Sequence, residues 1–336
     1  MSAGCWSGRR SCTAIRAAQR TTPEPAIDHH PEHASSMNLP AHAFPIVPLS
    51  FHLRSAGLRF PAFAGSVWHG GLGRELARVC PPAFACLYGG ADAARLYALR
   101  SSPGEVFPPG SELTLRLTLF GAAGEHALAC TQALLELGER GLDPAGRYRL
   151  LRASVVQPAG ERFFYGAGEG LCQPPATVGL GDWLHAVPPT DELEIRLHTP
   201  LCCKQGNALL RSAPEYAPLL QRLFGRLDQL AHAMRIAAPL SKAQRGALYD
   251  EVRGFRLRAA AVHWQTLSRR SARSGQQMTV GGLLGRWRYR GPMALTRGWL
   301  SVGQILQIGG KTAFGFGAYD VVAGPLPPLA ASEALG

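Results

Sequence analysis

The feature that most constrains the fold is the stretch Glu112–Phe120, in which leucine occupies every second position between threonine and arginine. Successive side chains of a β-strand point to opposite faces, so this alternation predicts a strand with one apolar and one polar face. We therefore interpret the neighbouring segments as parts of a sheet.

Segments on either side of this strand complete a recognisable order of elements. Periodicity and turn residues predict strands at 44–54, 96–99, 112–120 and 148–156, and helices at 67–79 and 124–140. Strand, helix, strand, strand, helix, strand is the order of the ferredoxin-like βαββαβ unit. Glycines 70, 71 and 73 lie inside the first predicted helix at a cost of about 1 kcal/mol each relative to alanine, so we expect another segment to approach that backbone closely.

The second half of the chain shows the same order. Five prolines and six glycines in 157–190 predict a linker or an irregular insertion. Beyond it, strands are predicted at 191–198, 255–264, 283–289 and 314–322, and helices at 219–234 and 294–308. No sequence repeat is visible, so the duplication rests on element order alone. The prediction is an α+β protein with two tandem ferredoxin-like (βαββαβ, RRM-like) domains, 37–156 and 191–325, followed by a tail at 326–336.

The N-terminal segment 1–36 is left out of the fold prediction. It carries four arginines before its first acidic residue, Glu24, and shows no periodicity. We interpret it as a disordered tail or an over-extended start, with Met37 as the true initiator.

Hydropathy and cysteine usage indicate the compartment. The chain has no run of 18 uncharged apolar residues, so we expect no membrane span and no membrane partner. Eight cysteines without a Cys-x-x-Cys pair favour a reducing cytoplasm over a disulfide scaffold. A zinc site of Cys80, Cys86, Cys202 and Cys203 is a weaker alternative than plain thiols, because their spacing fits no local zinc pattern. We predict no metal and no cofactor.

The charge balance indicates a polyanionic partner. The chain has 35 basic and 23 acidic residues, and segment 253–297 contains ten arginines without one Asp or Glu. A strand at 286–290 would place Arg286, Arg288 and Arg290 on one face and two aromatic residues on the other. Arginines without opposing carboxylates are typical of a phosphate-binding surface, so we predict nucleic-acid contact here and at Arg256 and Arg258. Burial of the two aromatic side chains in the core is the simpler alternative to base stacking.

A glycine-rich segment lies near the C-terminus, with Gly309, Gly310, Gly315 and Gly317 around Lys311. A nucleotide-binding P-loop would need a glycine at 305, where isoleucine stands, and a helix after it, so that interpretation is rejected. The remaining interpretation is a loop whose bare backbone lets a phosphate chain approach, with Lys311 as a point charge.

Residues 309–317, followed by 318–322, resemble the C-terminal signature of the RAMP (repeat-associated mysterious protein) superfamily. More closely, the chain resembles the CRISPR-associated pre-crRNA-processing endoribonucleases. The matching segments are 65–73, 107–121, 199–201 and 282–291, between Pro45 and about Val322. The resemblance implies the tandem ferredoxin-like fold and metal-independent cleavage of CRISPR repeat RNA by 2′-hydroxyl attack, leaving 2′,3′-cyclic phosphate and 5′-hydroxyl ends. The implied partners are repeat RNA or crRNA and other CRISPR effector-complex subunits.

Chemistry of this kind needs a base for the hydroxyl and a cation for the charge on phosphorus. The resemblance places the active site on the first helix, so His69 is predicted as the base and Arg74 and Lys311 as charge stabilisers. Relatives often show Arg-Gly-Ala-x-Gly-His here, whereas this chain has His69-Gly-Gly-Leu-Gly-Arg74. Because the two residue types are exchanged, cleavage assisted by arginine without an essential histidine stays open. A non-catalytic crRNA-binding RAMP subunit stays open too, whereas an esterase is set aside for lack of a Gly-x-Ser-x-Gly motif.

Overall fold

The computed structural model describes residues 44–61, 63–89, 94–206, 208–270, 277–324 and 326, which belong to one compact unit. Of residues 268–270 and 277–278 only the backbone is described. The predictions for 1–36 and for most of the tail at 326–336 lie outside the described residues, so they stay predictions.

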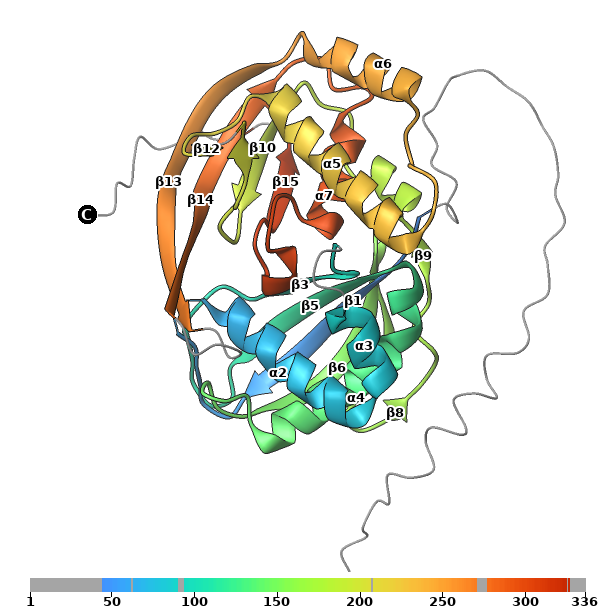
Figure 1. Cartoon of the computed structure of the whole chain (residues 1–336), viewed down its shortest axis with the longest axis vertical. Coiled ribbons are helices and arrows are strands. Elements are labelled where there is room, and N and C mark those ends of the chain that lie inside the picture. The colour runs from blue at the N-terminus through green and yellow to red at the C-terminus, as the bar shows by residue number, and fades with distance from the viewer. Residues whose placement is uncertain are drawn as a thin grey trace, which may run out of the picture. The chain divides into compact units, whose positions relative to one another are not determined.

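The first half contains the predicted βαββαβ unit. Its strands follow the spatial order β3 (Tyr97–Ser101), β5 (Glu112–Phe120), β1 (Pro45–Ser55) and β6 (Tyr148–Gln157), and every neighbouring pair is antiparallel. Helices α2 (Ala64–Val79) and α4 (Ala127–Arg140) cover one face of this sheet (Figure 1). The bounds of β5 are those predicted, because the alternating leucines are all buried on the helix side.

The second half repeats this arrangement. Its strands follow the order β13 (Arg256–Arg270), β14 (Gln277–Arg290), β10 (Glu192–Leu197) and β15 (Tyr319–Ala323), again antiparallel throughout. Helices α5 (Tyr216–Met234) and α7 (Arg297–Leu306) cover one face. In both sheets the first strand of the unit lies between the third and the fourth, so the tandem ferredoxin-like fold is confirmed by topology.

Several shorter elements were not predicted. Helix α3 (Pro81–Tyr88) follows α2, and α6 (Lys242–Val252) follows α5. The remaining short elements are β2 (Leu58–Arg59), β4 (Val106–Phe107), β8 (Gly170–Leu171), β11 (Lys204–Gln205), β12 (Ala208–Leu209) and the 3-10 helices η2 (Gly121–His126), η3 (Leu180–His185) and η4 (Thr312–Phe314).

Segment 157–190 is more ordered than its proline and glycine content suggests. Strand β7 (Gly160–Gly166) forms a hairpin with β6 and widens the first sheet, and β9 (Val178–Gly179) pairs with β1. The glycines serve the turns of this hairpin, where Gly160 has φ +138°.

The internal glycines of α2 have the structural reason that was expected. A Cβ atom at Gly71 would lie 2.5 Å from a methyl group of Leu142, and one at Gly73 would lie 2.7 Å from the Tyr88 ring. Gly70 is different, since the nearest atom to a Cβ added there would be a guanidinium nitrogen of Arg74, 3.6 Å away.

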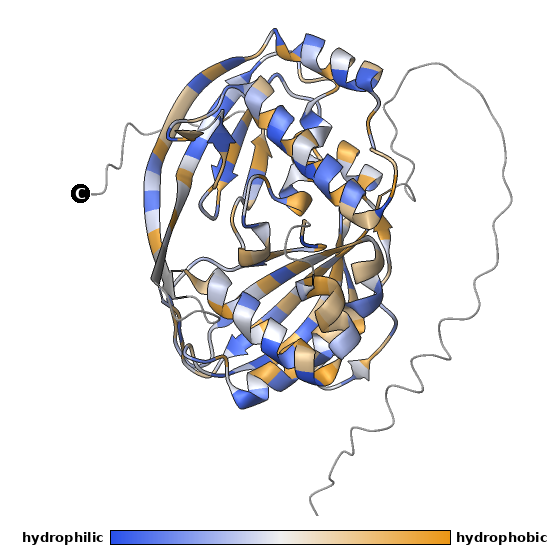
Figure 2. Ribbon diagram, in the orientation of Figure 1, coloured by the Kyte–Doolittle hydropathy of each residue, from blue (hydrophilic) through white to orange (hydrophobic). Residues whose placement is uncertain are grey.

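The two halves share part of a core. One buried cluster fills the space between the first sheet and its helices. The other lies between the second sheet and α5 and α7, and it includes Ile46, Ala98 and Phe120 from the first half. Figure 2 shows hydrophilic and hydrophobic residues alternating along β13 and around the helices, as expected for elements with one buried face.

Candidate active site beside the glycine-rich loop

The glycine-rich segment forms a closed loop between α7 and β15. The N–H of Ile308 donates to the carbonyl of Gly317 at 3.1 Å, and the N–H of Gly317 donates to Pro200 at 3.0 Å. Lys311 stands exposed at the tip with φ 64°, a left-handed conformation that is uncommon outside glycine. The structure therefore presents the Lys311 side chain on a loop whose base is fixed by backbone hydrogen bonds. The strand predicted at 314–322 begins only at Tyr319, because this loop and η4 occupy its first residues.

Three of the four loop glycines are required by the loop itself. Gly309, Gly315 and Gly317 have φ between +73° and +88°. A Cβ atom on Gly309 would lie 2.6 Å from the carbonyl oxygen of Cys202. A Cβ atom on Gly317 would lie 1.8 Å from the carbonyl oxygen of Ile308. Gly310 is exposed, and a Cβ atom there would lie 3.6 Å from the Cys202 carbonyl oxygen, an ordinary van der Waals contact. Backbone geometry thus explains most of the glycines, and Gly310 is the position where a bulky partner has room to approach.

Helix α2 begins directly against this loop. A Cβ atom at Gly65 would lie 1.9 Å from the carbonyl oxygen of Phe314, so only glycine permits the contact. One helical turn later, the His69 ring packs on the Phe314 ring with centroids 4.0 Å apart. The predicted base and the loop that carries Lys311 are therefore brought together by a close backbone contact.

His69 is held by two tyrosines. The Tyr97 hydroxyl oxygen lies 2.7 Å from His69 Nδ1, and the Tyr88 hydroxyl donates to the His69 carbonyl oxygen at 2.7 Å. Burial raises the pKa of both tyrosines, so both phenols are neutral at physiological pH. The His69 side chain itself is half-buried.

A tyrosine hydroxyl can accept as well as donate a hydrogen bond, so the contact with Tyr97 is compatible with either tautomer of His69. When Nδ1–H donates to Tyr97, the lone pair is on Nε2, which can then take a proton. The contact with Tyr97 therefore fixes the orientation of the His69 ring.

Arg74 lies on a different side of α2. It follows His69 by five residues, which corresponds to a rotation of about 140° around the helix axis. Its side chain is exposed and lies near Gly70. The structure therefore places His69 and Lys311 at the same loop and leaves Arg74 on a neighbouring surface of the helix.

The aromatic residues of 286–290 belong to the core. Trp287 and Tyr289 are both 0 % exposed, which confirms the simpler alternative considered for them. The three arginines lie on the opposite face, as the strand pattern predicted.

Two arginines of that face have acidic partners, contrary to the interpretation of the sequence. Arg288 is buried, and its Nε donates to Glu194 Oε2 on β10 at 2.7 Å. Arg290 is exposed, with Asp191 at 3.9 Å. The segment itself lacks carboxylates, but the adjacent strand in the sheet supplies them from about a hundred residues earlier in the chain.

The other predicted arginines are more accessible. Arg286 is half-buried, and Arg256 and Arg258 are exposed near the start of β13, where a β-bulge falls between Leu257 and Ala259. Arg256 also donates to the carbonyl of Phe255 at 2.7 Å. Among the arginines predicted to bind RNA, those whose guanidinium groups reach solvent are therefore Arg256, Arg258, Arg286 and Arg290.

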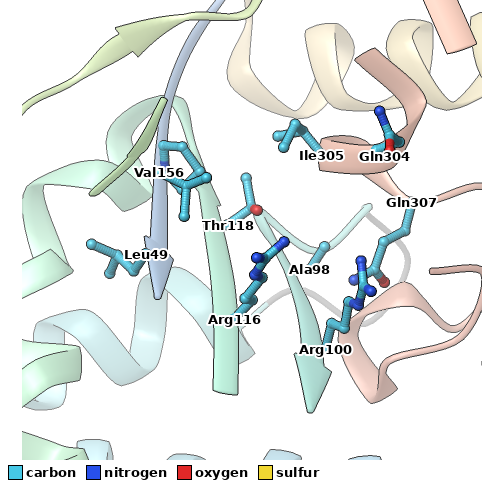
Figure 3. A pocket seen from close by; sticks show the side chains of 10 residues that line it. Leu49, Ala98, Arg100, Arg116, Thr118, Val156, Gln304, Ile305 and Gln307 are labelled. Atoms are coloured by element: carbon cyan, nitrogen blue, oxygen red, sulfur yellow. The ribbon is translucent and has the colours of Figure 1, made fainter. Parts of the chain in front are cut away.

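Sequence reasoning missed a polar cluster where the two halves meet. Asp320 of β15 binds Arg100 of β3 at 3.0 Å and His198 at 2.5 Å. Burial alone raises the pKa of Asp320, but the hydrogen bonds from His198 and Arg100 hold it well below its ordinary value. Figure 3 shows Arg100 and Arg116 side by side on neighbouring strands in a small pocket that α7 closes with Gln304. No local spacing connects residues 220 positions apart.

Within the described ranges, no three His, Cys, Asp or Glu side chains are grouped as metal ligands would be, and the six cysteines there are free thiols. No helix in that part of the chain is long and apolar enough to cross a bilayer.

Comparison with known families shows what each half of the chain resembles. A family model described as CRISPR-associated endoribonuclease Cas6 matches residues 195–319, which include the long β13–β14 hairpin and the glycine-rich loop. The second half of the chain is therefore similar to Cas6 endoribonucleases. An N-terminal domain model, AF_1859_N, matches residues 44–177, so the similarity to Cas6 at the level of sequence rests on the second half, and a different model covers the first.

Solved structures show the same fold at low sequence identity. A product complex of Cas6 (TTHB231), a Thermus thermophilus protein, matches with TM-score 0.54 and 18% identity, covering 82% of this chain and 100% of that chain. A product complex of Cas6 (TTHA0078) matches with TM-score 0.52 and 20% identity, covering 83% and 100%. A chain of a partial Cas6-RT-Cas1–Cas2 complex matches with TM-score 0.54 and 11% identity, covering 84% and 47%. Among curated proteins, none matches this chain.

Proposed function

We propose that this chain binds CRISPR repeat RNA and cleaves pre-crRNA without a metal ion. In this reaction a bond forms between the 2′-oxygen and the adjacent phosphorus while the bond from phosphorus to the 5′-oxygen breaks. The products are a 2′,3′-cyclic phosphate and a 5′-hydroxyl, and the leaving 5′-oxygen takes up a proton. The match of residues 195–319 to the Cas6 endoribonuclease model supports the substrate and the reaction class.

The observation that carries the proposal is the placement of His69. Its Nδ1 lies 2.7 Å from the Tyr97 hydroxyl oxygen, which fixes the orientation of the ring. In the tautomer in which Nδ1 carries the hydrogen, Nε2 has the lone pair that would take the proton from the 2′-hydroxyl. The His69 ring packs on Phe314, three residues after Lys311 in the same loop, and this contact supports pairing the base with that cation. Lys311 would stabilise the charge that develops on the phosphorane oxygens.

The RNA path follows from the accessible arginines. Arg256, Arg258, Arg286 and Arg290 offer guanidinium groups on the open face of the second sheet, and Gly310 leaves room at the loop. Arg288 is assigned a structural role in this proposal, because Glu194 already neutralises it. Other CRISPR proteins are proposed as partners, in line with the Cas6-RT-Cas1–Cas2 assembly to which one structural neighbour belongs.

The experiment that tests this proposal is single-turnover cleavage of repeat RNA by His69→Ala. We expect the rate to fall by roughly a hundredfold or more with RNA affinity unchanged, since a general base typically contributes that factor. Tyr97→Phe keeps the ring and removes the hydroxyl that fixes Nδ1, so it should show a smaller loss of the same kind. His232→Ala, an exposed histidine on α5, is the matched control and should cleave like the wild type.

A wild-type rate for His69→Ala would instead favour arginine-assisted cleavage, with Arg74 as the next residue to substitute. Tight binding without cleavage by the wild type would favour the non-catalytic crRNA-binding subunit. The exchanged positions of His69 and Arg74 are the observation that keeps both alternatives in view.

A further inference from the structure

An arginine lies on the buried side of α5, directly beneath the glycine-rich loop. Arg226 is 6% exposed and falls on the apolar stripe that Leu223, Leu227 and Leu230 form toward the core. Arginine is almost never fully buried unless it is paired with an acid. Its position therefore calls for an explanation beyond packing.

The polar contacts of Arg226 are few. Its Nη2 donates to the Thr312 hydroxyl oxygen at 2.9 Å, and its guanidinium carbon lies 5.8 Å from the centroid of the Phe120 ring. Among the described residues, Nε has no hydrogen-bond acceptor, and no carboxylate forms an ion pair with the group. Burial lowers the pKa of Arg226 to about 10, so the side chain is still charged at neutral pH.

A buried charge without a counter-ion is costly, because it has left water without gaining an opposite charge. The cation–π contact with Phe120 offsets only part of this cost. An anion held nearby would offset more. Thr312, to which Arg226 donates, directly follows the exposed Lys311 of the loop.

We propose that Arg226 is a positioning residue, which holds the loop through Thr312 and places a fixed positive charge behind the RNA phosphate bound at Lys311. This inference rests on the proposed function. The phosphate gains a second negative charge as the phosphorane forms, so a fixed cation behind the loop stabilises the transition state more than the bound substrate.

The size of the effect follows from Coulomb's law. For an assumed separation of about 8 Å between the two charges and an effective dielectric constant of about 20, removing a unit charge changes a rate by roughly thirtyfold. Charge develops only partly in the transition state, so we expect a loss of about tenfold on removing Arg226. Affinity should change little, because repeat RNA makes many other phosphate contacts.

The test uses three variants of the full chain. Arg226→Met removes the charge and keeps an apolar chain, Arg226→Lys keeps the charge without the planar group, and Thr312→Val removes the hydroxyl at nearly constant shape. Each is measured for single-turnover cleavage of repeat RNA, for RNA affinity, for the urea midpoint of unfolding, and for hydrogen exchange of the amides at 311–317.

We expect Arg226→Met to cleave about tenfold more slowly with unchanged affinity and an unfolding midpoint no lower than that of the wild type. Arg226→Lys should recover most of the rate. Loop amides should exchange faster in Arg226→Met and Thr312→Val than in the wild type. A merely structural arginine would instead lower the unfolding midpoint without rescue of the rate by lysine.

A wild-type cleavage rate for Arg226→Met would overturn the inference and leave the proposed function intact. If the wild type binds repeat RNA without cutting it, the proposed function fails separately. The exchange measurement then decides the inference: faster exchange in Arg226→Met supports it, and unchanged exchange overturns it.

Discussion

Removing the carboxylate of Glu194 should strongly destabilise the second half of the molecule. Glu194 is 0% exposed and is bound by Arg288, whose side chain is 8% exposed, and by Arg196, whose side chain is 43% exposed. In Glu194→Gln the Arg196 side chain can turn toward water, whereas Arg288 stays buried and loses the carboxylate that its Nε binds. Breaking a buried ion pair on one side costs about 3 kcal/mol or more.

Urea unfolding at pH 7 measures this cost. With an m-value of about 3 kcal/mol/M, a loss of about 3 kcal/mol lowers the midpoint by about 1 M. Glu112→Gln is the matched control, because Glu112 pairs with Arg54 at the surface and both side chains are more than half exposed. An exposed pair of this kind contributes about 1 kcal/mol or less. The double variant Glu194→Leu with Arg288→Met should regain most of the midpoint, since no buried charge is left unpaired.

The pH dependence of the same contribution has a definite sign. Burial alone raises the pKa of Glu194, but hydrogen bonds from Arg196 and Arg288 hold it below its ordinary value. The stabilisation is therefore complete above the ordinary glutamate pKa of about 4.3, and it is lost as the pH falls through the lower pKa of the folded state. A midpoint for Glu194→Gln equal to that of the wild type at pH 7 would refute the reasoning.

Two further outcomes follow from the loop and the arginine face. Gly317→Ala should destabilise the fold by about 1 kcal/mol or more and lower the unfolding midpoint, because a φ of +73° and a Cβ contact of 1.8 Å exclude a side chain there. Gly310→Ala, the control, should change the unfolding midpoint little. The double variant Arg286→Gln with Arg290→Gln should weaken repeat-RNA binding, and the slope of log affinity against log salt should fall by the equivalent of about two phosphate contacts. Arg54→Gln on the first sheet should leave both the affinity and the slope unchanged. Filter binding across a salt series measures both quantities.

The sequence predicted the regular elements because their periodicity and their burial agree. Strand β5 has the predicted bounds, and the βαββαβ order was correct in both halves. Helix α3 was missed because its eight residues are apolar on nearly every side and show no amphipathic period. The order in segment 157–190 was missed because the glycines that signal a break also build the turns of a hairpin.

The site was less predictable than the fold, because its contacts join distant parts of the chain. His69 was chosen from a family resemblance, but its partners Tyr97 and Phe314 lie 28 and 245 positions further on, and no spacing rule connects them. Arg288 was assigned to RNA from a segment without acids, yet sheet pairing brings Glu194 beside it. Arg226 lies among leucines on the buried face of α5. Only the structure shows that its side chain is buried and that its Nε has no hydrogen-bond acceptor among the described residues.

Cleavage of the repeat RNA encoded beside the gene, in EDTA, tests the central claim most directly. The assay compares the natural RNA with one that carries a 2′-deoxy nucleotide at the cut site. The account predicts one cut in the natural RNA, with a 2′,3′-cyclic phosphate end, and no cut at that position in the deoxy substrate. Cleavage of the deoxy substrate at the same position, or a requirement for added metal, would contradict the proposed attack by the 2′-hydroxyl.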